Sequence, residues 1–422
     1  MLLEHNNPSG LTVPKAEFGS VASVTPAPID PRRRDEAVYI ESPVLSSLTQ
    51  IRSFFESGMF SMNETPVFIR GSKFVKLQAA LRFARPEVPF NLIEPRQVSS
   101  LPVPDGTVVF YPFNSQSNMT AVDNRKLRHV LTLHGESNKF ASNRPAARIY
   151  DYVCIAGPKA RDRYVRAGIF TPHAADAGRL IMMGDSFVQS IKWIRAAKTS
   201  EDGVLFYSPT WEGYGNGADN YSSVAEIRGF EIAIRAARAA GINRVVVKSH
   251  PYLGLLRPSL LGDFVRGVKA IQAAGLDVSI STSEANFPLR FLAKLRLSDA
   301  SVAIENSENP IPIRLALCDV SGMEAIFLKQ GIPHLTITRT EDIPLGLEEI
   351  FALKGIQNAD DVDKKVQRYL DESRGIDATH SSHVFGWQSD ELRNMTGGQR
   401  RKWLIDYVRE DPYWSSAMAN QS

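Results

Sequence analysis

The stretch RHVLTLHGESNK, residues 128–139, decides which fold we expect for this chain. Its apolar run at residues 130–133 suits a short buried strand, which stops at His134-Gly135 and is followed by polar residues. Two later stretches have the same arrangement: RVVVKSHP at residues 244–251 and LALCDVSGMEAIF at residues 315–327. Because ligands of open parallel sheets bind beyond the carboxyl ends of the strands, these stretches predict strand ends that face one cleft.

Apolar runs alternate with amphipathic segments along most of the chain, which is typical of parallel sheets covered by helices. Further strands are expected at residues 66–70, 107–113, 151–156 and 203–209, and the alternation continues through residues 244–248, 270–274, 276–280, 315–320 and 334–338. Helices are expected at residues 43–59, 74–84, 159–167, 186–197, 224–240, 348–352, 359–371 and 398–410. The predicted fold class is α/β, with two Rossmann-like parallel-sheet domains facing a central cleft.

A chain of 422 residues is long for one hydrophobic core, so two domains are expected. The pattern breaks near Gly184-Asp185, and a second alternation begins at residue 203. The expected organisation is a tail at residues 1–36, an N-terminal domain at 37–185, a C-terminal domain at 186–385, and a C-terminal helix within 386–422 that packs back on the N-terminal domain.

Composition narrows the function classes. A net charge of +3 is too small to favour nucleic-acid binding, although it allows a local basic pocket for phosphates. The two cysteines lie inside apolar runs, and no apolar segment resembles a signal peptide or a membrane-spanning helix, so a cytoplasmic protein is expected. A peripheral contact of the basic run at residues 32–34 with the inner face of a membrane is an alternative to a solvated tail.

His134 is the first candidate catalytic residue. A histidine at a strand end, followed by Gly135, can project into a cleft while the backbone turns, and its ordinary pKa near 6.5 lets it accept a proton. The loop side chains that could orient it or support an acceptor are Glu136, Ser137 and Lys139. The alternative is a histidine that only caps the turn.

His250 is the second candidate, because Lys248, Ser249 and His250 place a cation, a hydroxyl and an imidazole just beyond a β-branched run. Such groups can neutralise a diphosphate and stabilise its leaving oxygen. Pro251 restricts His250 to extended backbone. A plain strand-end turn with a solvated lysine is the alternative.

Asp319, Ser321 and Gly322 form the third candidate site. Ser321 and Glu324 have the spacing of a capping box that opens a helix, and a helix start with a glycine is also an anion-binding site. Thr210 and Trp211 follow another strand end, where they could meet a phosphate and pack on a base. The glycine-rich residues 213–223 could close over the cleft as a lid or form an ordinary surface loop.

No zinc motif, Walker loop or nucleophile elbow is present, so no metal site is expected. Transfer without a covalent intermediate needs only positioning, one base and charge stabilisation, which fits this sparse set of groups. A Mg²⁺ ion could still be carried by the diphosphate of a donor.

The ordered set LTLHGESNK, YDYVCIAGPKARDRY, FYSPTWEG, VVVKSHP and CDVSGMEAIF spans roughly residues 105–340. This set resembles the CDP-glycerol glycerophosphotransferase family, the teichoic-acid and capsule polysaccharide polymerase relatives that have a GT-B fold. The resemblance implies a bacterial enzyme in which an acceptor hydroxyl attacks a CDP-linked donor and CMP leaves.

The resemblance also implies a role for each motif. His134 would be the general base on the acceptor side, and His250 would contact the donor phosphates from the C-terminal domain. The donor diphosphate would be held by Asp319, Ser321 and Gly322, with Thr210 and Trp211 nearby. Two positions depart from the family: a second serine usually stands where Gly322 is, and an arginine where Glu212 is, which leaves a different donor or acceptor open.

The leading hypothesis is therefore a transferase that moves phosphoglycerol, or a sugar or sugar phosphate, from a CDP-linked or other nucleotide-linked donor to a polyol or glycan acceptor in cell-surface polysaccharide synthesis. A nucleotide-sugar 2-epimerase would share the two-domain layout but needs acidic groups to move a proton, and the motifs contain no such carboxylate cluster. A nucleotide-binding protein without turnover is the non-enzymatic alternative.

Overall fold

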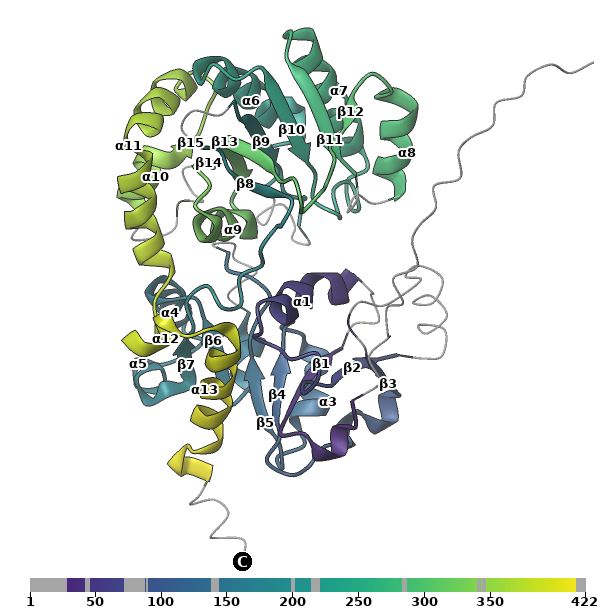
Figure 1. The fold of residues 1–422 in the computed structure, drawn as a ribbon, viewed down its shortest axis with the longest axis vertical. Helices are drawn as coiled ribbons and strands as arrows, with labels where there is room; N and C mark the ends of the chain where they lie inside the picture. Colours follow the sequence, from purple (N-terminus) through teal and green to yellow (C-terminus); the bar gives the residue numbers. More distant parts are fainter. Residues whose placement is uncertain are drawn as a thin grey trace, which may run out of the picture.

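The computed structural model describes residues 29–41, 46–71, 88, 90–137, 144–198, 202–213, 221–282, 287–339, 343 and 347–414. Two α/β units stacked along the long axis of the molecule make up this part of the chain (Figure 1). Each unit is built on one parallel sheet, and a short connection at residues 183–193 joins the two sheets.

The first sheet has the strand order β3-β2-β1-β4-β5-β6-β7, and all its strands run parallel. The strands are β1 (Glu36–Ile40), β2 (Val67–Arg70), β3 (Asn91–Ile93), β4 (Val108–Tyr111), β5 (Arg128–Leu131), β6 (Tyr152–Ile155) and β7 (Leu180–Met182). The order reverses between β1 and β4, as in doubly wound nucleotide-binding folds.

Both faces of this sheet are buried, as β4 illustrates. Val108 and Phe110 belong to one apolar cluster, while Val109 and Tyr111 belong to the cluster on the opposite face. Neighbouring residues of a strand point to opposite faces, so a strand covered on both sides is apolar throughout. The covering helices are α1 (Ser46–Glu56), α3 (Met119–Val122), α4 (Pro158–Arg166) and α5 (Pro172–Ala174).

The second sheet has the order β12-β11-β10-β9-β13-β14-β15, with β8 pairing to β13, and it is also parallel throughout. Its strands are β8 (Ile194–Ala196), β9 (Val204–Ser208), β10 (Arg244–Lys248), β11 (Asp277–Ser281), β12 (Ser301–Val302), β13 (Ile311–Asp319), β14 (His334–Ile337) and β15 (Gly355–Ile356). The order reverses between β9 and β13, which marks the position where ligands bind in such sheets.

The helices of the second domain are α6 (Arg228–Ala239), α7 (Ser259–Ala273), α8 (Phe287–Arg296), α9 (Gly322–Gln330) and α10 (Glu348–Lys354). Two Rossmann-like parallel sheets therefore face each other across a gap between the domains, which confirms the predicted GT-B-like fold class.

After α10 the chain returns to the first domain. Helix α11 (Val362–Val384) leaves the second domain, and α12 (Asp390–Asn394) and α13 (Gly397–Arg409) lie against the first (Figure 1). The N–H of Gly386 donates to the carbonyl of Ala156 at 2.8 Å, and the N–H of Gln388 donates to the carbonyl of Met182 at 2.8 Å. Leu404 and Val408 of α13 are buried in the core of the first domain.

The helix predicted at residues 186–197 is wrong. This segment forms turns and then β8, and the Gln330 side chain satisfies part of its backbone. The side-chain oxygen of Gln330 accepts from the N–H of Ile191, and its Nε2 donates to the carbonyls of Ile191 and Ile194. The spacing of apolar residues within 186–197 cannot reveal this contact, because Gln330 lies far away in the sequence.

Other elements differ in extent or were missed. The central strand β1 was not predicted. It begins at Glu36, the last residue of the segment expected to be a tail. Helix α11 is much longer than the predicted 359–371, because it spans the distance between the domains. Residues 1–28, the helix predicted at 74–84 and most of the predicted lid lie outside the described residues.

The return of the chain depends on a close approach at Gly157. A Cβ placed on Gly157 would lie 2.4 Å from the Gly386 nitrogen and 2.6 Å from the Val384 oxygen, both backbone atoms. We expect Gly157→Ala to lower the melting temperature and to release residues 384–388 to proteolysis, because backbone atoms cannot move aside as a flexible side chain would.

The matched control for this substitution is Gly262→Ala, an exposed glycine inside α7 with no atom within 4 Å of its added Cβ. This control should gain about 0.5–1 kcal/mol of stability, because glycine is a poor helix former. Equal thermal stability of the Gly157→Ala variant and the wild type in scanning calorimetry would contradict the importance of this contact.

Candidate functional site

The loop after β5 forms the first wall of the site, and its backbone is strained. Leu133 has φ = +60°, in the left-handed region that residues other than glycine rarely occupy. Gly135 has φ = +155°, which is also unfavourable for residues with a side chain. A left-handed conformation costs a residue other than glycine, here Leu133, about 1–3 kcal/mol, and such strain is concentrated at functional sites. The backbone conformations of Leu133 and Gly135 turn the chain sharply on both sides of His134.

His134 is held in one tautomer. Its Nδ1 lies 2.9 Å from the carbonyl oxygen of Pro112, an acceptor, so Nδ1 carries the proton and donates it. Its ring packs on Phe113 with the ring centroids 4.6 Å apart. Burial lowers the pKa of His134 below the usual 6.5, and the bond to Pro112 opposes this only partly. The neutral ring then has Nε2 as its acceptor, which is the state required of a general base.

Glu136, which was expected to orient His134, instead anchors the loop to α4. Its Oε1 accepts from Arg163 at 2.6 Å, and both side chains are largely buried. An ion pair shielded from water is screened less than a surface pair, so it can hold the loop in place. Ser137 follows in the same loop, and Lys139 lies outside the described residues.

Asp319 organises the opposite wall. This residue ends β13 and is fully buried. Its Oδ2 accepts the backbone N–H of Thr210 at 2.7 Å and that of Ser223 at 3.1 Å. The carboxylate therefore ties both ends of the connection between β9 and α6 to β13, at the position where the strand order reverses.

Ser321 caps α9, because its hydroxyl accepts the N–H of Met323 at 3.3 Å. The capping box predicted with Glu324 is not formed. Glu324 is buried instead and accepts from the hydroxyl of Thr336 at 3.1 Å. Gly322 begins the helix, and a Cβ on it would lie 3.6 Å from the carbonyl oxygen of Glu136. The start of α9 thus lies directly against the loop that carries His134.

The end of β10 brings together three predicted residues. Lys248 and Ser249 are buried, and the Ser249 hydroxyl has no hydrogen-bond partner within the described part of the chain. Nδ1 of His250 accepts the N–H of Tyr252 at 3.1 Å, so in the neutral ring the proton is on Nε2. The ring stacks on Trp211 with centroids 5.7 Å apart and 14° between the planes.

Glu212, the position where the resembling family usually has arginine, shapes the loop after His250. Its carboxylate accepts the backbone N–H groups of Gly254, Leu256 and Arg257 at 2.8–3.1 Å. Three backbone donors on one buried carboxylate satisfy its oxygens and hold the loop in a single conformation. The residue therefore fixes the backbone beyond β10.

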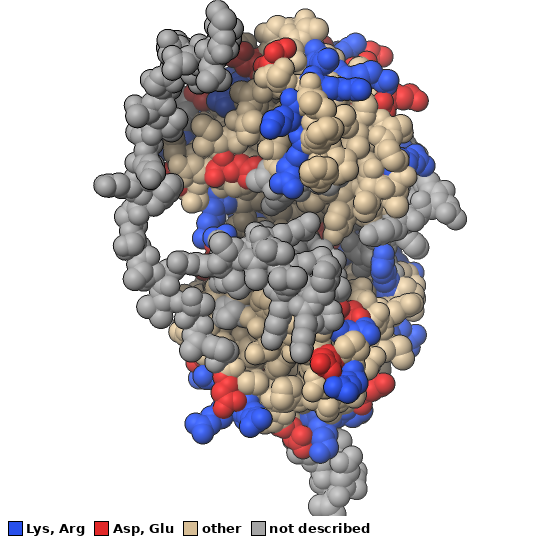
Figure 2. All heavy atoms as spheres, turned by 90° about the vertical axis from the view of Figure 1, so that its right-hand side faces the viewer, with Lys and Arg blue, Asp and Glu red and all other residues tan. Residues whose placement is uncertain are grey.

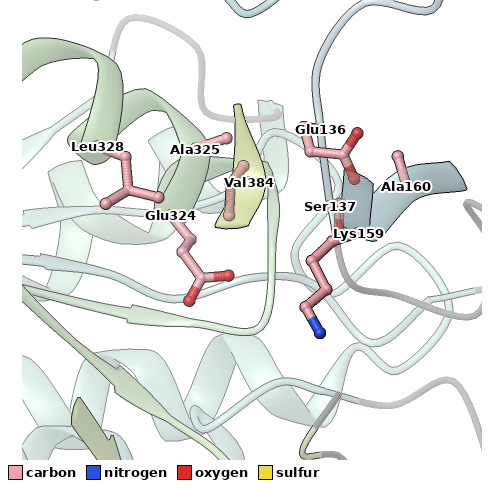
Figure 3. A pocket seen from close by; sticks show the side chains of 8 residues that line it. All are labelled: Glu136, Ser137, Lys159, Ala160, Glu324, Ala325, Leu328 and Val384. Atoms are coloured by element: carbon pink, nitrogen blue, oxygen red, sulfur yellow. The ribbon is translucent and has the colours of Figure 1, made fainter. Parts of the chain in front are cut away.

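A pocket lies between the domains, with about 290 Å³ of space that is partly open to solvent (Figure 3). Its lining residues are Glu136, Ser137, Lys159 and Ala160 of the first domain, Glu324, Ala325 and Leu328 of α9, and Val384 at the end of α11. Figure 3 shows the Lys159 side chain of α4 on one side of Val384 and the Glu324 side chain of α9 on the other. His134 and His250 do not line this pocket.

Lys159 and Arg163 were not predicted from the sequence as candidate site residues. Both belong to α4, which follows β6 directly after Gly157-Pro158. This is the same arrangement of a strand end followed by polar groups that singled out His134. The signal was therefore present, but the segment was assigned only a helix.

A buried cluster behind α9 has the composition of a metal site. Ligand atoms of Glu324, His334 and His380 lie within 4.8 Å of one another. However, the ammonium group of Lys354 lies 2.8 Å from His334 Nε2, 3.2 Å from His380 Nδ1 and 2.7 Å from the carboxylate of Asp377. The protein thus supplies its own cation at this position, although burial lowers the pKa of Lys354.

No family model and no curated protein matches this chain. Among solved structures, the chain is similar to Arabidopsis thaliana UGT89C1 complexed with UDP-L-rhamnose, with 8% identity, a TM-score of 0.49, and coverage of 89% of this chain and 99% of that one. S. aureus MnaA with UDP shows 12% identity, a TM-score of 0.47, and coverage of 88% and 96%. A mutant of the Thermobaculum terrenum O-GlcNAc transferase shows 13% identity, a TM-score of 0.42, and coverage of 94% and 71%.

The assignment of the fold rests on the strand order of the two sheets. Among the described residues, no helix has the length and apolar composition needed to cross a bilayer.

Four histidines whose pKa values are lowered make stability depend on pH. Burial lowers the pKa values of His129, His134 and His334, and it lowers the pKa of His380 to about 2. Below about pH 6.5 the unfolded chain binds protons that the folded chain does not, so folding stability falls as the pH falls. We expect the free energy of unfolding in urea to decrease from pH 7 to pH 5.5, by up to about 1.4 kcal/mol per pH unit for each histidine.

The His380→Gln variant tests the origin of this slope. It lacks one of the four groups and should show a shallower dependence of the unfolding free energy on pH than the wild type. A wild-type free energy that stays constant between pH 7 and pH 5.5 would mean that these imidazoles are not buried in their neutral form.

Proposed function

We propose that this protein is a transferase that moves a phosphoglycerol or glycosyl group from a nucleotide diphosphate donor to an acceptor hydroxyl. The observation that carries the proposal is the fixed tautomer of His134. The Pro112 carbonyl accepts the Nδ1 proton in a hydrogen bond, and burial favours the neutral ring. The loop that carries His134 meets the start of α9 through the backbone of Glu136.

The second domain is the proposed donor side. Helix α9 begins at the point where the strand order reverses, and the positive end of a helix dipole favours a bound phosphate. Lys248, His250 and the buried Ser249 hydroxyl come from the carboxyl end of β10, which is separated from β13 by β9 in the same sheet. A diphosphate would supply an acceptor for that hydroxyl, which otherwise stays unsatisfied.

The proposed reaction needs no covalent enzyme intermediate. Nε2 of His134 takes the proton of the acceptor hydroxyl, and the oxygen attacks the donor. With CDP-glycerol, the oxygen bonds to the phosphorus that carries glycerol, the bond to the bridging oxygen breaks, and CMP leaves. With a nucleotide sugar, the anomeric carbon is attacked and the nucleoside diphosphate leaves. Lys248, the Nε2–H of His250 and the start of α9 stabilise the charge on the leaving group.

Both donors remain part of the proposal, as do a polyol or glycan acceptor, a cytoplasmic location and a role in cell-surface polysaccharide synthesis. The motif resemblance favours CDP-glycerol. A Mg²⁺ ion would be carried by the donor phosphates, because the nearby carboxylates of Asp319 and Glu212 already accept backbone hydrogen bonds.

The test is nucleotide release from CDP-glycerol and a panel of nucleotide sugars, with and without polyol or glycan acceptors. His134→Ala should lower kcat by about 10²–10⁴, the usual contribution of a general base. The affinity for the free nucleotide should stay unchanged. In the wild type, kcat should fall on the acid side with an inflection below pH 6.5, because the pKa of His134 is lowered.

His173→Ala is the matched control, since His173 is exposed on the short helix α5. It should leave turnover unchanged. His250→Ala should weaken donor binding. Release that is insensitive to both His134→Ala and His250→Ala would exclude these roles. An epimerised sugar formed without acceptor would instead favour an epimerase, and tight nucleotide binding with no turnover would favour a non-catalytic protein.

A further inference from the structure

Helix α8 (Phe287–Arg296) exposes an apolar stripe on the second domain. Phe287, Phe291 and Leu295 are spaced by four residues and therefore lie on one side of the helix. Their exposed fractions are 72%, 53% and 62%. The rings of the two phenylalanines are stacked, with centroids 6.2 Å apart and 18° between the planes. Large side chains this exposed usually mark an interaction surface when they are contiguous.

The apolar stripe is separate from the side of α8 that packs on the core of the second domain. Leu289, Ala293 and Leu297 supply the buried side and join the main apolar cluster of the second domain. The helix is thus docked on the domain, and its outer side carries a second apolar surface that is mostly exposed to solvent. Such a helix has two apolar sides, one for the core and one for a partner.

Basic residues accompany the stripe. Arg290, Lys294 and Arg296 are exposed on α8, and the helix contains no acidic residue. In Figure 2, which faces the side of the molecule where α8 lies, Lys and Arg side chains border a broad area of uncharged side chains on the upper domain. Long basic side chains can reach phosphates while the apolar residues between them enter a nonpolar layer.

The neighbouring sheet edge extends this surface. Only four residues, 297–300, separate α8 from β12, which is the edge strand of the second sheet. Val302 in this strand and Ile304 just after it are 63% and 77% exposed. Two elements that meet at the same edge therefore both expose apolar side chains to solvent.

We propose that α8, together with the β12 edge, is a docking surface for an anionic lipid bilayer. The combination of stacked aromatic rings, an exposed leucine and three cations on one helix matches the apolar layer and the anionic headgroups of a membrane surface. The partner is chosen from charge complementarity, because an apolar protein partner or a second copy of the chain would gain nothing from the three cations. This surface is distinct from the interdomain pocket and does not depend on the proposed function.

The experiment is sedimentation of the full chain with large vesicles of phosphatidylcholine alone or mixed with phosphatidylglycerol. We expect binding to the anionic vesicles that weakens as salt is raised. The Phe287→Ser, Phe291→Ser double variant should bind at least tenfold more weakly. The Arg290→Gln, Lys294→Gln, Arg296→Gln triple variant should lose roughly fivefold per cation on anionic vesicles and change little on neutral ones.

Two controls separate this surface from other exposed groups. Met119→Ser removes an apolar side chain that is 54% exposed on the first domain and should leave vesicle binding unchanged. Substitution of residues 32–34 by glutamine tests the basic run near the N-terminus and should also leave most of the binding intact. Melting temperatures of all variants, compared with the wild type, report whether each remains folded.

Several results would overturn the proposal. The proposal fails if the folded wild type does not bind anionic vesicles. It also fails if binding is lost only when residues 32–34 are changed. If the wild type self-associates in analytical ultracentrifugation and the Phe287→Ser, Phe291→Ser variant is monomeric without any change in vesicle binding, the stripe serves contacts between copies of the chain instead.

Discussion

A single buried carboxylate sets the geometry on which the candidate site depends. Asp319 ends β13 and accepts backbone N–H groups from both ends of the connection that follows β9. A buried carboxylate without such donors would be costly, so the two strands and the connection are held together. This arrangement places the start of α9 at the reversal of strand order. It also places Gly322 against the loop that carries His134.

The returning chain holds the second domain against the first. The buried cluster behind α9 connects the elements of the second domain from which this chain returns. Gly157 allows residues 384–386 to pass in backbone contact with the start of α4. Lys354 links His334 and His380, and thereby connects β14, α10 and α11 behind the helix that lines the pocket. The pocket walls thus rest on a few polar contacts, most of them buried, rather than on the apolar cores alone.

The sequence was sufficient for the elements whose signal is local. Apolar strands such as 244–248 and the helix that Gly241 terminates were predicted correctly, as was the class of fold. Contacts between distant residues were not predictable in this way. Glu324 fits the sequence pattern of a capping box, but its side chain accepts a hydrogen bond from Thr336 instead. Residues 186–197 do not form the predicted helix, and the side-chain amide of Gln330 bonds part of their backbone. The roles of Glu136 and Glu212 as loop anchors likewise required the positions of Arg163 and of the loop after β10.

The central claim is that groups from both domains bind one nucleotide diphosphate. Hydrogen–deuterium exchange of the wild-type chain, measured with and without saturating CDP or UDP, tests it most directly, because a ligand of the native state slows exchange where it binds. We predict slower exchange in the first turn of α9 and at residues 249–250, with a smaller effect at residues 135–137. Protection confined to other regions, or none with either nucleotide, would contradict the claim.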